Sequence, residues 1–96
     1  MNYNVIFEPE ATSDLNTNWQ HLEDQRAGLG YDFLSRVTDA VFSLETYAEI
    51  SEMKGKGWRR VKLDKFNYHL WYKVFDTDVV VLHIAHGHQS IDFIEK

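Results

Sequence analysis

A change in hydrophobic periodicity near Gly57 constrains the fold of this 96-residue chain more than any other feature. Before it, apolar residues recur every three or four positions within 10–25 and 30–48, which predicts two amphipathic helices. After it, apolar residues alternate with polar ones or form short β-branched and aromatic runs, which is typical of strands. The apolar helix positions are Ala11, Leu15, Trp19 and Leu22, then Leu29, Phe33, Val37, Ala40, Val41, Leu44 and Ala48.

The strands expected from the pattern give the order β-α-α-β-β-β. A first short strand ends at Pro9, whose fixed φ suits the first turn of the following helix. The last three strands should form an antiparallel meander, with the helical hairpin covering one face and the first strand joining across it. We therefore expect an α+β fold with a small, antiparallel-dominated sheet. The expected strands are 3–8, 58–63, 68–75 and 79–86.

Length and composition limit the classes of protein. A chain of 96 residues has room for one domain, so residues 1–96 are taken as a single domain. The absence of cysteine excludes disulfides, thiol nucleophiles and cysteine-based zinc sites, and no cofactor-binding motif is found. The start has no secretory signal, and the longest apolar stretch, 79–82, is too short to span a bilayer. We expect a cytoplasmic protein with no cofactor and no membrane partner.

Charge is unevenly distributed along the chain. The net charge is −5, yet residues 54–65 hold six bases and one acid. This segment is either a solvated strand face or a patch for phosphates or an acidic partner, and the sequence leaves both open. Overall acidity disfavours a protein that lives on nucleic acid, because neutralising its backbone usually needs net positive charge. The candidate target- or phosphate-binding residues are Lys54, Lys56, Arg59, Arg60 and Lys62.

Strand alternation assigns these side chains to two faces of the sheet. Arg60 should share the uncovered face with Trp58 and Lys62, whereas Arg59 should face the helices and pair with an acid such as Asp14. Trp71 should lie opposite to its neighbours Leu70 and Tyr72 on its strand. We expect large aromatic side chains to remain exposed on the uncovered face, where they would mark an interface.

Three histidines close the last predicted strand. His86 and His88 would project to one side of an extended strand and His83 to the other. Since no fourth ligand is spaced nearby, we predict no metal site. The remaining alternatives are packing or hydrogen bonding at the end of the strand, or proton transfer near neutral pH by His86 and His88.

The chain resembles the RelE/ParE toxin superfamily of type II toxin–antitoxin systems, and is closer to ParE-like plasmid-stabilisation proteins. Four pieces in order carry the resemblance and together span nearly the whole sequence. They are Val5-Ile-Phe-Glu-Pro9-Glu-Ala-x-x-Asp14-Leu15, Gly28-Leu-Gly30-x-x-Phe33, Arg59-Arg60-Val-x-Leu63-x-x-Phe66-x-Tyr68-x-Leu-x-Tyr72 and Val81-Leu-His-Ile-Ala-His86.

This resemblance implies a toxin neutralised by a cognate antitoxin that adds an extended segment to its surface. ParE-like members inhibit DNA gyrase by binding, which is the function expected here. The alternative is a RelE-like, metal-independent endoribonuclease that cleaves mRNA on the ribosome. A third alternative is a degenerate or solitary member that only binds partners, and a homodimer also stays open.

The sequence departs from many relatives after the last strand. Many members carry one or two arginines after the final histidine, but this chain reads His86-Gly-His88-Gln89-Ser90. No arginine follows Arg60. If the protein were a ribonuclease, the resemblance would assign proton transfer to His86 or His88 and stabilisation of the phosphate to Arg60. We therefore expect a binding protein rather than an enzyme.

Overall fold

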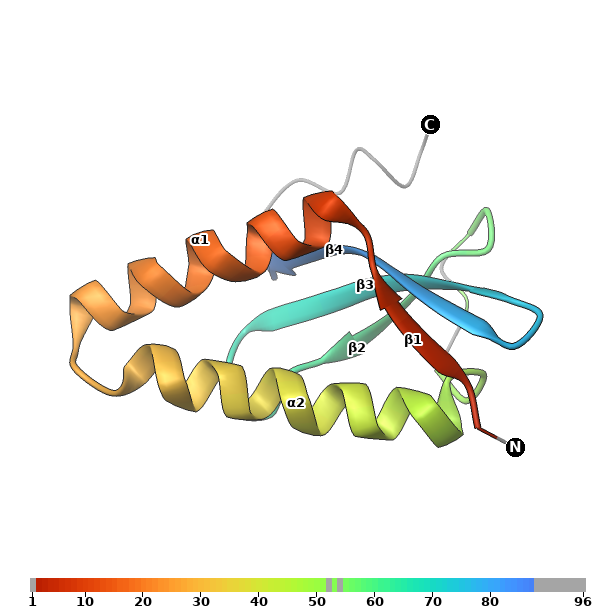
Figure 1. Ribbon diagram of the computed structural model, residues 1–96, viewed down its shortest axis with the longest axis horizontal. Coiled ribbons are helices and arrows are strands. Elements are labelled where there is room, and N and C mark those ends of the chain that lie inside the picture. The colour runs from red at the N-terminus through yellow and green to blue at the C-terminus, as the bar shows by residue number, and fades with distance from the viewer. Residues whose placement is uncertain (1, 52, 54, 88–96) are drawn as a thin grey trace.

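The protein folds as two helices packed on a four-stranded sheet in the computed structural model, which describes residues 2–51, 53 and 55–87 (Figure 1). The predicted order β-α-α-β-β-β is confirmed, and element boundaries shift by one residue at most. The elements are β1 (Asn4–Phe7), α1 (Pro9–Gln25), α2 (Leu29–Tyr47), β2 (Arg59–Lys62), β3 (Tyr68–Phe75) and β4 (Asp78–His86).

The strands lie in the order β1-β4-β3-β2, so the first and the last strand are neighbours. The predicted meander of β2, β3 and β4 is antiparallel, whereas β1 pairs with β4 in parallel. This parallel pair follows from the hairpin, because α2 returns the chain to the level of Tyr3, whose N–H donates to Glu45 O at 2.7 Å. β2 therefore begins at the same end of the sheet as β1. Because β3 is antiparallel to β2 and β4 is antiparallel to β3, β4 runs in the same direction as β1.

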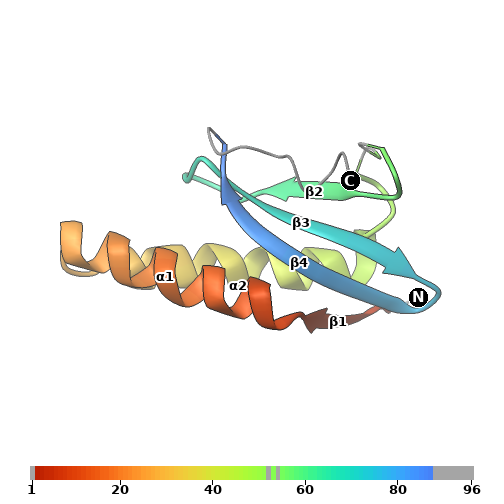
Figure 2. The same cartoon turned by 90° about the horizontal axis from the view of Figure 1, so that it is seen from above.

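Both helices cover the same face of the sheet (Figure 2). The main core lies between that face and α2, which buries an apolar stripe at helical spacing. α1 contributes less, since Leu15 and Trp19 are only half-buried against this core. The buried members are Phe33, Val37, Ala40 and Leu44 from α2, Ala11 and Leu22 from α1, Tyr68, Leu70, Tyr72, Val79, Val81 and Ile84 from the sheet, and Ala48 and Leu63 from the loops.

The helical hairpin is closed by contacts between its two arms. Gly28 has φ +89°, a left-handed conformation that glycine adopts without strain. Because it has no side chain, Gly28 cannot cap the N-terminus of α2 itself. The Glu23 carboxylate of α1 supplies the cap, accepting from Gly28 N at 2.9 Å and Gly30 N at 3.0 Å. A side chain at Gly30 would meet Trp19 O at 2.7 Å, so glycine permits the close approach of the two helices.

α1 also completes the sheet beyond the end of β1. β1 pairs only with residues 78–81 of β4, which leaves the outer edge of the following residues without a strand. There Asp14 Oδ2 accepts from Ile84 N at 3.0 Å, and Asn18 Nδ2 donates to Ile84 O at 3.5 Å. Side chains of α1 thus take the place of a longer β1 at this edge. Figure 1 shows α1 and β4 as neighbours there.

Candidate functional site

The face of the sheet away from the helices, here called the open face, carries cations held on aromatic rings. Arg60 of β2 pairs with Trp71 of β3, and its guanidinium carbon lies 5.3 Å from the centroid of the Trp71 ring. Lys73 Nζ lies 4.7 Å from the centroid of the Trp58 ring. The two indole rings contact each other edge to face at 6.4 Å. The assignment of Arg60 and Trp58 to this face is confirmed, Trp71 lies on the same face, and each cation is fixed by a cation–π contact.

The expectation of exposed aromatic rings on this face is wrong. Trp58 is 7% exposed and Trp71 2%, and together with Ala85 and Leu82 they form a second, smaller apolar cluster. The open face therefore presents the charged ends of its basic side chains rather than indole surface. Positive charges of this kind attract carboxylates and phosphates.

The remaining predicted cations divide between the open face and the turn before it. Lys62 is exposed and pairs in register with His69 of β3, next to Arg60 and Trp71. Lys56 is exposed in the turn that precedes β2, at φ 53°. Lys54 lies outside the described residues.

Arg59 faces the helices as expected, but its partners are not the expected ones. Its Nη1 donates to Glu49 O at 3.1 Å and also to Ser51 O, so the guanidinium holds the main-chain carbonyls at the end of α2. The expected pairing with Asp14 is wrong, because Asp14 lies at the opposite edge of the sheet against Ile84. Arg59 lies across the sheet from Arg60 and does not contribute to the open face.

Further main-chain carbonyls near the end of α2 accept hydrogen bonds from the start of β1 and from β3. The carbonyl of Glu45 accepts from Tyr3 N, and that of Ala48 accepts from the Tyr72 hydroxyl at 2.7 Å. The last turn of α2 contains no basic residue of its own, so Arg59 supplies the positive charge favoured at a helix C-terminus. Burial raises the pKa of the Tyr72 hydroxyl, which keeps it protonated as a donor.

His86 lies on the helix side of the sheet. It pairs in register with Tyr68, and the two rings contact edge to face at 5.1 Å. Tyr68 is buried in the main core against Phe33, so His86 and Arg60 lie on opposite faces. His88 lies outside the described residues. The predicted catalytic group of Arg60 and His86 is therefore not brought together.

Two histidines of the described strands lie on the open face: His69, whose ring contacts Trp71 at 6.4 Å, and His83, which pairs with Trp71 and contacts the Trp58 ring at 6.1 Å. His83 Nε2 lies 3.6 Å from Glu10 and its Nδ1 lies 3.7 Å from Asp14, both on α1. The two carboxylates approach different ring nitrogens, so the three groups do not converge on one point. The predicted packing role of His83 at the edge fits this position, whereas the acids on α1 were not foreseen.

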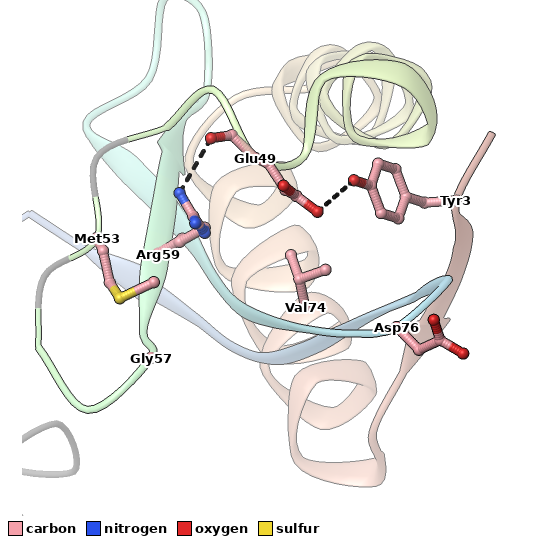
Figure 3. Close-up of a pocket in the computed structure, with 7 residues that line it drawn as sticks. All are labelled: Tyr3, Glu49, Met53, Gly57, Arg59, Val74 and Asp76. Atoms are coloured by element: carbon pink, nitrogen blue, oxygen red, sulfur yellow. Dashed lines mark hydrogen bonds between the residues drawn. The ribbon is translucent and has the colours of Figure 1, made fainter. Parts of the chain in front are cut away.

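A pocket of about 540 Å³ lies on the helix side at the end of α2 (Figure 3). Tyr3 donates its hydroxyl to Glu49 Oε1 at 2.6 Å, which raises the pKa of Tyr3 above its ordinary value. Val74 and Met53 provide apolar lining, and Met53 reaches this place through a β-bridge with Arg59. The pocket is lined by Tyr3, Glu49, Met53, Gly57, Arg59, Val74 and Asp76.

An antiparallel helical hairpin on one face of a mixed four-stranded sheet, with cations on the other face, defines a small α+β protein of the RelE/ParE type. The chain belongs to the ParE toxin family of type II toxin–antitoxin systems: the family model for the ParE toxin of the parDE system matches residues 5–91. No curated protein matches the sequence.

Solved structures of toxins share the fold at low sequence identity. A chain of the chromosomal ParDE system of P. aeruginosa is 16% identical with a TM-score of 0.74, over 88% of this chain and 95% of that one. A mutant of the E. coli toxin RelE in the free state is 18% identical with a TM-score of 0.66, over 97% and 92%. A chain of the intact E. coli RelBE toxin–antitoxin complex is 21% identical with a TM-score of 0.59, over 91% and 99%. Within the described residues, no helix is long and apolar enough to cross a membrane.

Proposed function

We propose that this ParE-family toxin acts in the cytoplasm by binding DNA gyrase and is neutralised by a cognate antitoxin. The family supports the toxin role, and the similar chain from a ParDE system supports the ParE-like mode over the RelE-like one. The solved RelBE and DinJ–YafQ complexes, which contain chains of this fold, support an antitoxin as partner.

One observation favours binding over catalysis: Arg60 and His86 lie on opposite faces of the sheet. Cleavage of RNA without a metal needs a proton-transfer group and a cation at the same phosphate. These two residues cannot meet there, because the sheet lies between them. Binding a protein requires only a complementary surface, which Arg60, Lys62 and Lys73 can offer to an acidic partner.

The experiment compares two sets of variants after induced expression. Arg60→Glu with Lys62→Glu should abolish growth arrest and inhibition of gyrase supercoiling, since the charges reverse at the binding face. His86→Ala with His88→Ala should leave both intact. Arg26→Glu, a single charge reversal in the exposed loop between the helices, serves as the control for Arg60→Glu alone.

The same strains report on the ribonuclease alternative. Ribosome-dependent mRNA cleavage should be absent from the unmutated protein. Efficient cleavage that is lost in the double histidine variant would establish the RelE-like function instead. The antitoxin is tested by expressing the protein from the adjacent reading frame, which should restore growth and co-purify with the chain.

A further inference from the structure

The pocket at the end of α2 is separate from the open face, and acidic side chains lie on two of its walls. Glu49 and Asp76 lie on different walls, at the end of α2 and at the turn between β3 and β4 (Figure 3). The carboxylate of Glu49 already accepts from the Tyr3 hydroxyl, which occupies one oxygen and leaves the other to a ligand. The lining thus contains two carboxylates from separate elements.

Among the described lining residues the cation is Arg59, and its hydrogen bonds go to main-chain carbonyls rather than to this pair. Arg59 directs Nη1 to the main-chain carbonyls of Glu49 and Ser51, away from both carboxylates (Figure 3). Its charge is offset by the partial negative charge of the C-terminus of α2, where no other basic residue lies. A positively charged group in the pocket would therefore meet a negative field from Glu49 and Asp76.

The apolar lining restricts the kind of cation that fits. Val74 and Met53 give the pocket an apolar wall, and Met53 is 53% exposed. Ile50, at the same end of the molecule, is 76% exposed. A small hydrated ion would leave these side chains in water. Lysine and arginine carry a charged head on an aliphatic stem, so either one could satisfy the carboxylates and cover the apolar wall together.

We propose that this pocket is an anchor site for a lysine or arginine side chain of the antitoxin. Only the identity of the partner rests on the proposed function. The pocket lies on the helix side of the sheet, so the antitoxin would hold this site without using Arg60 and Lys62 of the open face. A basic side chain is complementary to it in charge and in shape.

The test uses two conservative substitutions that remove charge alone. Asp76 has φ +56°, a conformation that asparagine tolerates as well as aspartate, so Asp76→Asn should preserve the turn. Glu49→Gln keeps an oxygen that accepts from the Tyr3 hydroxyl. Asp24→Asn removes one carboxylate charge from the exposed surface of α1 and serves as the control. The ligand is the purified protein of the adjacent reading frame.

The double variant should bind this antitoxin about tenfold more weakly or worse, since it loses two charge pairs that the bound antitoxin would cover. The control should stay within about twofold of the unmutated chain. Expressed alone, the double variant should remain toxic, and a larger dose of antitoxin should be needed to restore growth. Unchanged affinity of the double variant would overturn the proposal.

A small probe separates failure of the pocket from failure of the proposed function. If the unmutated chain binds no antitoxin, the proposed function fails, but n-butylguanidinium still tests the site. This probe should shift the amide resonances of Gly57 and Val74 saturably in the unmutated chain and in Asp24→Asn, but not in the double variant. Equal shifts in all three, or none in the unmutated chain, would rule out a site for basic side chains.

Discussion

Arg59 and Arg60 are adjacent in the sequence and serve opposite sides of the molecule. Successive strand residues point to opposite faces, so one guanidinium reaches the end of α2 and the other lies over Trp71. Their chemistry is the same, but their surroundings differ. Arg59 holds the end of α2, whereas Arg60 places its charge on the open face.

Replacing Arg59 with alanine should destabilise the fold without changing the charged side chains of the open face. The carbonyls of Glu49 and Ser51 would lose a charged donor, which costs about 1.5–3 kcal/mol. Urea unfolding should show this loss, while Lys62→Ala should change the free energy of unfolding by less than about 0.5 kcal/mol. Equal effects of the two substitutions would contradict the helix-capping role of Arg59.

The Tyr72 hydroxyl should make stability fall at alkaline pH. Its pKa is raised in the folded protein by burial, so the folded state retains the proton to higher pH than the unfolded state. The contribution of Tyr72 to the free energy of unfolding is therefore constant below the ordinary pKa of 10.0. It declines as the pH rises from there towards the folded pKa.

The variant Tyr72→Phe separates this effect from general alkaline unfolding. It removes the hydrogen bond to Ala48 O and should lower the free energy of unfolding by about 1 kcal/mol at neutral pH. Thermal melts across the alkaline range should show a flatter decline for this variant. Tyr68, whose pKa burial also raises, would keep part of the slope.

At the scale of elements, α1 acts partly as a helix and partly as a sheet edge. Its Asp14 and Asn18 bond the main chain of Ile84 where β1 no longer reaches β4. An unpaired strand edge is a site for unwanted pairing with other chains. The helix covers this edge with two side chains.

Asp14→Ala should expose that edge. The Ile84 amide would lose its acceptor in a partly buried place, at a cost of about 1–3 kcal/mol. Hydrogen exchange at the Ile84 amide should accelerate. Glu10→Gln, which alters the other carboxylate beside His83, should leave that amide protected. If both variants exchange alike, the edge is held by something other than Asp14.

The elements themselves were predictable because their signals are local. Helical spacing and strand alternation depend on neighbours within a few residues, and the assignment of Arg60 and Trp58 to one face followed from alternation. The contacts of Arg59 with α2 and of Asp14 with β4 were not predictable, since they join distant segments. The burial of Trp58 and Trp71 was missed because alternation gives the direction of a side chain but not what covers it.

At the scale of the whole molecule, charge is separated between two layers. Residues 1–50 hold nine acids and two bases, and these residues include both helices. The open face carries Arg60, Lys62 and Lys73. This polarity favours one orientation of approach to an acidic partner, because long-range attraction acts before contact.

On the proposed function, the association rate with gyrase should fall as ionic strength rises, with little change in the dissociation rate. Arg60→Glu with Lys62→Glu should remove most of that dependence. Surface plasmon resonance across a salt series would measure both rates. A dependence that is confined to dissociation would place the charges in the final contact rather than in the approach.

The pairing of β1 with β4 has a consequence for synthesis of the chain. Asn4 pairs with Asp78 and Phe7 with Val81, so β1 has no partner strand until β4 has been synthesised. Contacts between such distant segments form slowly. A nascent chain that stops short of β4 would leave β1 unpaired. The complete toxin fold therefore forms only after β4 has left the ribosome, which gives a co-translated inhibitor time to be present.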